Sequence, residues 1–252
     1  MFSLPVLAAL AVVAAVTSFI SGIFGMAGGM LLIGFLLFLL PVPVAMVFHG
    51  VIQIAANGWR AWLWRHHVRW SVVLQFGSGT AVSLVVLSFF NFVPDKALVL
   101  MVVGLTPFAA LAVPQRIAPD IERGGQAFVA GAIGGAMQLV AGITGPLLDI
   151  FYVRTGMTRQ TNIATKAAAQ VLGHLTKVTY FAALIDNPAG RDLEQWLVMA
   201  YAACFAVLGT TLSRSFLDRM SDKQFYRWTR RVILAIGVVY LGQGIWLMVT
   251  RW

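Results

Sequence analysis

Residues 21–40 read SGIFGMAGGMLLIGFLLFLL and contain no charged side chain. An apolar stretch of about 20 residues is long enough to cross a hydrocarbon core of roughly 30 Å as a helix. Glycines at positions 22, 25, 28 and 29 interrupt this stretch, and the backbone can leave helical geometry there. Non-helical backbone survives at membrane depth only where protein or a water-filled cavity satisfies its polar groups. The stretch therefore predicts a broken membrane helix whose break lines a cavity.

The whole 252-residue chain has the composition of a membrane protein. Hydrophobic residues make up 60% of it, charged residues only 11%, and the mean hydropathy is +0.84. A water-soluble domain must cover its surface with polar groups and does not reach these values. The net charge of +9 thus does not indicate a nucleic-acid-binding protein, and the expected partner is the lipid bilayer. A single cysteine excludes an intrachain disulfide and a thiolate metal cluster.

Charged, Gly-rich and Pro-containing stretches divide the chain into ten predicted helices. They cover residues 5–24, 29–40, 43–64, 70–90 and 95–113, followed by 125–142, 146–155, 159–185, 193–213 and 224–249. No Lys or Arg precedes the first helix, so we expect it to belong to the mature fold and not to a cleaved signal peptide. The second and seventh helices are too short to cross a bilayer. The seventh also follows a glycine break, within AGITGPLL at 141–148.

The basic residues predict the topology. If every predicted helix reverses the chain, 13 of the 18 Lys and Arg residues fall on one face, including Arg65 and Arg219. The opposite face receives Lys96, Arg191 and Arg251. The positive-inside rule makes the first face cytoplasmic, so both termini are predicted to be periplasmic.

The two halves share a pattern of polar residues. Residues 49–60 read HGVIQIAANGWR, and residues 166–177, at a shift of 117, read KAAAQVLGHLTK. The aligned polar pairs are His49 with Lys166, Gln53 with Gln170, Asn57 with His174, and Arg60 with Lys177. At a shift of 120, Gly22, Ile23 and Gly25 align with Gly142, Ile143 and Gly145. Because five helices are an odd number, a second copy of the same fold must lie upside down relative to the first.

We therefore predict an all-α polytopic membrane protein. Residues 1–115 would form one transmembrane repeat and residues 120–252 a second, inverted one, each of five helices with a short second helix after a break.

The aligned polar residues also predict a site. Spacings of 4, 8 and 11 residues place them on one stripe of each helix, and short helices that begin after a break direct unpaired N–H groups into a cavity. Together these features predict an anion site near the bilayer midplane. Its predicted residues are Gly28, Gly29, His49, Gln53, Asn57, Thr144, Gly145, Lys166, Gln170, His174 and Lys177. The alternative is that these side chains only hold helices together, with Lys177 snorkelling to the membrane surface.

Asp149 is the one acid placed well inside a predicted membrane helix. It is expected either to couple transport to protons or to form an ion pair with Lys166 or Lys177. The chain has no HExxH, no GxSxG and no paired carboxylates, so neither catalytic residues nor a metal site is predicted.

Three segments, SGIFGMAGG, GITGPLL and ATKAAAQVLGHLTK, occur in this order and resemble motifs of the TauE/SafE sulfite exporter family over essentially the whole chain. The resemblance implies a small polytopic permease of the bacterial inner (plasma) membrane, without a cofactor, for sulfite, sulfonates or other small sulfur-containing anions. It implicates Gly25, Gly28 and Gly29 in the first half, Thr144, Gly145 and Pro146 in the second, and the face around Gln170 and His174. The second break, GITGP, lacks the longer run of glycines that is common in the family.

We therefore expect a permease that carries sulfite or an organosulfonate by alternating access. A permease for a carboxylate or another small organic anion is the alternative with the same site. A membrane-embedded enzyme and a non-catalytic assembly subunit are the rival classes. The expected partners are a small anion and the bilayer, and a homo-oligomer is also compatible with the sequence.

Overall fold

The computed structural model describes residues 3–185, 192–217 and 222–250, and it places no β-strand among them. The first half contains α1 (Leu4–Phe24), α2 (Ala27–Leu39), α3 (Val42–Leu63), α4 (Trp70–Ser88) and α5 (Lys96–Ala112). The second half contains α6 (Gln126–Ala141), α7 (Gly145–Tyr152), α8 (Arg159–Thr179), α9 (Leu193–Leu217) and α10 (Asp222–Val249). The all-helical fold is confirmed.

Local sequence signals explain where several of these helices begin. Proline lies in the first turn of α1, α3 and α7, where its missing N–H would have had no helical partner. The side chain of Asp95 accepts a hydrogen bond from the backbone N–H of Leu98 and caps α5, and Thr158 caps α8 in the same way.

Five helices of the described chain are long and apolar enough to cross a membrane by length and composition. They are Leu4–Phe24, Val42–Leu63, Trp70–Ser88, Leu193–Phe216 and Arg227–Val249. Large apolar side chains such as Leu74, Phe89 and Trp246 are exposed on the outside of the bundle, which suits contact with lipid. The protein is therefore a multi-pass membrane protein.

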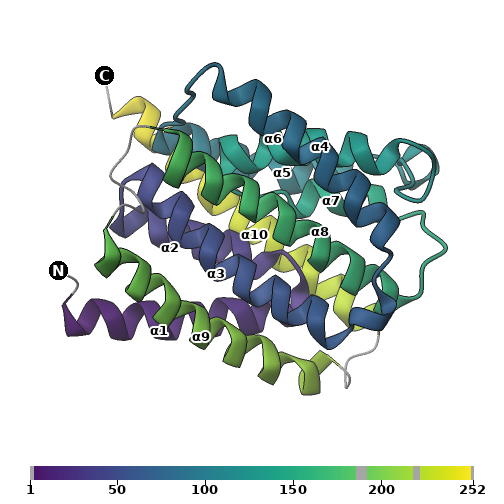
Figure 1. Cartoon of the computed structure of the whole chain (residues 1–252), viewed down its shortest axis with the longest axis horizontal. Coiled ribbons are helices and arrows are strands. Elements are labelled where there is room, and N and C mark those ends of the chain that lie inside the picture. The colour runs from purple at the N-terminus through teal and green to yellow at the C-terminus, as the bar shows by residue number, and fades with distance from the viewer. Residues whose placement is uncertain (1–2, 186–191, 218–221, 251–252) are drawn as a thin grey trace.

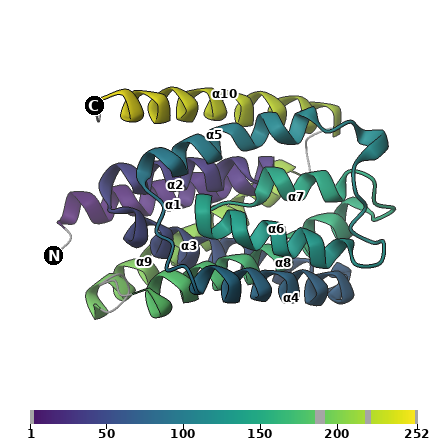
Figure 2. The same cartoon turned by 90° about the horizontal axis from the view of Figure 1, so that it is seen from above.

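The antiparallel helices α3 and α8 run through the middle of the bundle (Figure 1). Helix α1 packs against α9 and α6 packs against α4, and α9 and α4 also contact α3 and α8 respectively. Helices α10 and α5 pack together along one edge (Figure 2), where α10 contacts α2 and α5 contacts α7. Glycine allows the close crossings: a Cβ at Gly131 of α6 would lie 2.0 Å from the carbonyl oxygen of Phe76 in α4.

Helix α1 begins and α10 ends at the same end of the bundle, on the left of Figure 1. The short helical turn Arg65–His67 lies at the opposite end. Arg191, Arg219 and Arg251, which were counted for the topology, lie outside the described residues. Which end faces the periplasm stays a prediction.

Candidate functional site

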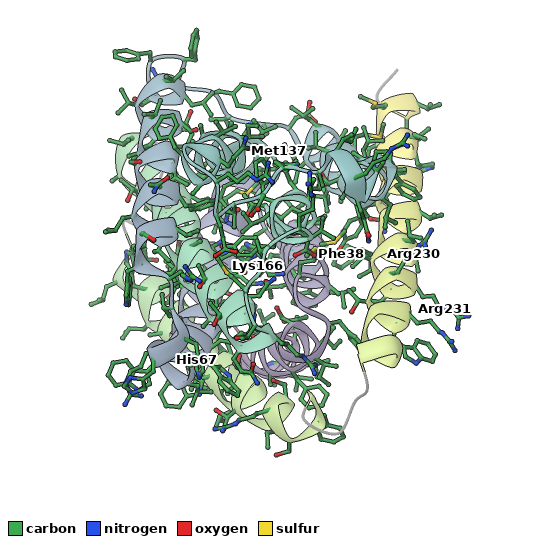
Figure 3. The ribbon with its side chains drawn as sticks, turned by 90° about the vertical axis from the view of Figure 1, so that its right-hand side faces the viewer. Phe38, His67, Met137, Lys166, Arg230 and Arg231 are labelled. Atoms are coloured by element: carbon green, nitrogen blue, oxygen red, sulfur yellow. The ribbon has the colours of Figure 1, made fainter. Side chains whose placement is uncertain are left out.

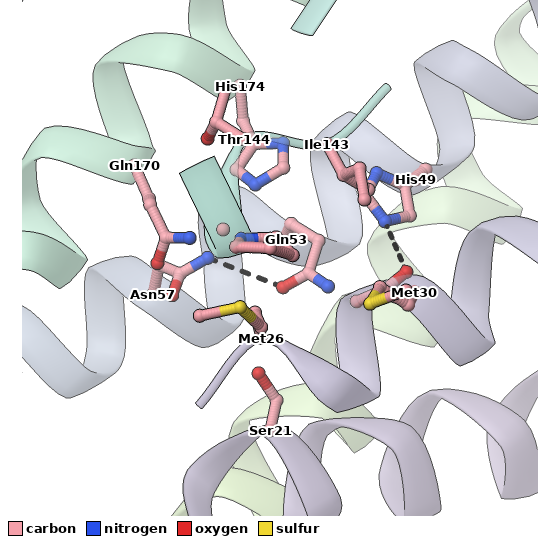
Figure 4. A pocket seen from close by; sticks show the side chains of 13 residues that line it. Ser21, Met26, Met30, His49, Gln53, Asn57, Ile143, Thr144, Gln170 and His174 are labelled. Atoms are coloured by element: carbon pink, nitrogen blue, oxygen red, sulfur yellow. Dashed lines mark hydrogen bonds between the residues drawn. The ribbon is translucent and has the colours of Figure 1, made fainter. Parts of the chain in front are cut away.

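A cavity of about 310 Å³ lies where the break between α1 and α2 meets the break between α6 and α7. We call it the central pocket (Figure 4). It is lined by Ser21, Met26, Gly29, Met30, His49, Gln53, Asn57, Ile143, Thr144, Gly145, Pro146, Gln170 and His174.

The central pocket gathers most of the predicted site residues. Eight of them line it: Gly29, His49, Gln53, Asn57, Thr144, Gly145, Gln170 and His174. The polar stripes of α3 and α8 face each other because the two helices cross antiparallel, and the rings of His49 and His174 have centroids 5.4 Å apart. None of the described residues that line the pocket is acidic.

The two breaks bring helix N-termini to the pocket. Gly25 ends α1 with a φ of 69°, and Gly142 ends α6 with a φ of 75°, a left-handed backbone that favours glycine. The side chains of the N-cap residues, Met26 for α2 and Thr144 for α7, accept no hydrogen bond from the first N–H groups. These groups and the positive ends of two helix dipoles are therefore available to a ligand.

A chain of hydrogen bonds joins the break between α1 and α2 to the break between α6 and α7. Lys177 donates from Nζ to Nδ1 of His49 over 2.6 Å and to the carbonyl oxygen of Gly142 over 2.9 Å. His49 donates from Nε2 to the carbonyl oxygen of Gly29, also over 2.9 Å. The Lys177 side chain is fully buried, so the alternative that it snorkels to the membrane surface is wrong. Lys177 holds His49 in place by this hydrogen bond and does not itself line the pocket.

Gln138 of α6 is a polar neighbour of the pocket that the sequence analysis did not single out. It is fully buried and donates from Nε2 to Nδ1 of His174 over 2.5 Å. When the amide Nε2 is the donor, Nδ1 accepts, and a neutral imidazole then carries its proton on Nε2 and can act as a donor. An amide four residues before Gly142 in the otherwise apolar GAMQLVAG was the available signal.

A second cavity, of about 460 Å³, adjoins the central pocket and shares Ser21, Met26 and Gln170 with it. We call it the basic pocket. The other residues that line it are Gly22, Ile23, Gly25, Arg60, Ile163, Lys166 and Ala167. Two of the predicted site residues, Gly25 and Lys166, thus lie here and not in the central pocket.

The structure pairs Asp149 of α7 with Lys166 of α8 in a salt bridge. Of the two predicted roles for Asp149, this geometry provides the ion pair.

Gly28 lines neither cavity: a Cβ there would lie 1.8 Å from the carbonyl oxygen of Thr17, so this glycine allows α2 to fold back against α1. Among the described residues, no group of three or more His, Cys, Asp or Glu side chains is placed to hold a metal ion.

A family model described as "Sulfite exporter TauE/SafE" matches residues 10–240, which is most of the chain. Searches of curated proteins and of solved structures gave no match. The matched region includes both breaks, α3 and α8, and therefore every residue of the two pockets. The chain belongs to the TauE/SafE sulfite exporter family, a family of membrane transporters and not of enzymes.

Proposed function

We propose that the protein carries sulfite or a small organosulfonate across the membrane and binds it in the central pocket. The observation that carries the proposal is the donor set: the His174 imidazole, amides and two helix N-termini surround one cavity, and none of its described lining residues carries a carboxylate. A desolvated oxyanion needs several such donors, because each of its oxygens loses hydrogen bonds to water.

The donors of the pocket come from several directions. His174 offers Nε2 because Gln138 holds its Nδ1, and Gln170 lines the pocket from the same helix. Gln53 accepts from Asn57 over 3.3 Å with Oε1, which leaves its Nε2 amide free to donate to an anion. The match to the sulfite exporter family favours a sulfite or sulfonate group over a carboxylate.

Alternating access by two inverted repeats is part of the proposal, and the packing of the helices supports it. Exchange of α1–α5 with α6–α10 turns the pair α1–α9 into α6–α4, α3–α9 into α8–α4, and α10–α2 into α5–α7. The pairs α3–α8 and α5–α10 map onto themselves. All of these pairs are in contact, as an inverted repeat requires.

The ends of the two stripes differ in the way that alternating access needs. Lys177 is bonded to His49 and to the carbonyl oxygen of Gly142. The aligned residues in the other half are Arg60, Lys166 and Gly22, and all three line the basic pocket, where no direct bond joins them. One end of the path is thus closed by hydrogen bonds and its counterpart holds a cavity.

The test is transport of labelled sulfite into proteoliposomes, with methanesulfonate and acetate as competitors. We expect methanesulfonate to compete and acetate to compete weakly. Gln170→Ala and His174→Ala should each weaken sulfite binding by about tenfold, the equivalent of one charge-assisted hydrogen bond. Strong competition by acetate alone would favour a carboxylate permease, and sulfite binding that survives both substitutions in folded protein would contradict the proposed site.

A further inference from the structure

We propose that the basic pocket is a second anion site, in which Arg60 holds the anion between the central pocket and the end of the bundle that carries Arg65–His67. The inference rests on the proposed function, because the anion is the same. It adds a residue, Arg60, that the stripe alignment named but the predicted site did not include.

The bonding of Arg60 is incomplete. Its side chain is only 9% exposed, and Nη1 donates to Oδ1 of Asn57 over 3.2 Å. Nη2 is buried and has no hydrogen-bond partner among the described residues. A buried guanidinium group without a counter-charge costs free energy, so an anion that binds beside Nη2 would recover part of that cost.

The wall of the basic pocket fits an oxyanion. Lys166 supplies a second cation, and its partner Asp149 does not line the cavity. None of the described residues that line the cavity is acidic. The flat fork of a guanidinium group suits two oxygens of a sulfite, sulfonate or carboxylate group, whereas an ammonium group acts as a point charge.

The position of the basic pocket places it on a path. On α3, Arg60 follows Asn57 of the central pocket by about 4.5 Å of helix rise, in the direction of Arg65. On α8, Lys166 lies about 6 Å of rise before Gln170, towards the same end. In Figure 3, which looks onto the end of the bundle that carries His67, Lys166 lies among the helices while Arg231 points away from them. An anion that leaves the central pocket towards this end would meet Arg60 and Lys166 first.

The hydrogen bonds of Arg60 also connect the two pockets. Arg60 donates to Asn57, which in turn donates to Gln53 over 3.3 Å. An anion that binds at Arg60 and pulls the guanidinium group towards it would release Oδ1 of Asn57. The amides of the central pocket therefore respond to occupancy of the basic pocket.

The experiment measures equilibrium binding of labelled sulfite to the purified full chain in detergent. Gln53→Ala combined with His174→Ala first impairs the central pocket. We expect weaker but saturable binding to remain in this double variant. Adding Arg60→Gln should lower that remaining affinity by about tenfold or more, the loss of a charged hydrogen bond. Arg60→Lys, which keeps the charge and loses the fork, should lower it less.

The matched control is Arg65→Gln, which removes the same charge from the same end of the bundle. Arg65 is exposed, stacks on Trp62 and lines neither pocket, so we expect remaining binding to change less than twofold. Thermal unfolding of each variant verifies that it is folded. If Arg60→Gln leaves the remaining sulfite affinity unchanged, or if Arg65→Gln lowers it equally, the second site is overturned and the proposed function stays intact. A folded wild-type protein that binds neither sulfite nor methanesulfonate would overturn the proposed function, and the second site with it.

Discussion

Lys177 of α8 donates a hydrogen bond to His49 of α3 over 2.6 Å, and both side chains are completely buried. The bond continues from Lys177 to the carbonyl oxygen of Gly142 and from His49 to that of Gly29, so it ties together the breaks of the two halves. The comparison of the two stripes in sequence aligns His49 with Lys166, so it does not indicate that His49 contacts Lys177. The contact arises from the antiparallel crossing of α3 and α8.

Lys177→Met should destabilise the protein strongly. The substitution leaves Nδ1 of His49 and the carbonyl oxygen of Gly142 buried without their donor, at about 1–3 kcal/mol for each group. Thermal unfolding in detergent measures the loss, and Lys96→Met, at the start of α5, is the control of the same chemistry. An unfolding temperature equal to that of the control would mean that the buried chain of hydrogen bonds contributes nothing.

Asp149→Asn should have a small effect on stability. The side chains of Lys166 and Asp149 are 20% and 39% exposed, so water screens both the pair and the lysine left behind. We expect a loss of about 1 kcal/mol or less in the free energy of unfolding. Because Asp149 forms an ion pair, the variant should keep whatever response to a pH gradient the wild-type protein shows in proteoliposomes. Loss of that response in a stable Asp149→Asn protein would instead assign the carboxylate to proton coupling.

Gln138→Leu should weaken anion binding without contact between the altered side chain and the anion. It removes the donor to Nδ1 of His174, so the imidazole is no longer held in the tautomer that presents Nε2–H. We expect sulfite affinity to fall by about tenfold in equilibrium binding. Gln75→Leu, on the exposed face of α4, removes an amide of the same kind away from the pocket, and this variant should bind sulfite with normal affinity. Equal affinities of the two variants would show that Gln138 does not position His174.

Topology is tested with single cysteines in a Cys204→Ser background. His66→Cys lies in the turn at the basic end of the bundle, and Thr250→Cys lies just after the end of α10. The positive-inside rule predicts that a membrane-impermeant thiol reagent added outside whole cells labels residue 250 and not residue 66. Labelling of residue 66 alone would reverse the orientation.

The sequence by itself determined the class of protein and most of its elements. Apolar stretches separated by charges, prolines and glycines predicted all ten helices, because in a bilayer each backbone N–H and C=O must be satisfied within its own segment. The glycine breaks, such as the one at Gly25, also predicted that the second and seventh helices are short, because each of these helices begins after a break. The polar stripes were visible because His, Gln, Asn and Lys are rare among apolar neighbours.

Only the tertiary structure decided which side chains meet. A stripe gives the face of a helix but not its partner or its depth. For that reason, Lys177 and Lys166 looked alike in sequence, while one is buried against His49 and the other pairs with Asp149 at the edge of the basic pocket. The same limit concealed Gln138, whose importance depends on the crossing of α6 and α8, and the free Nη2 of Arg60. Distances between helices far apart in the chain come from packing, and the spacing of residues along one helix contains no information about them.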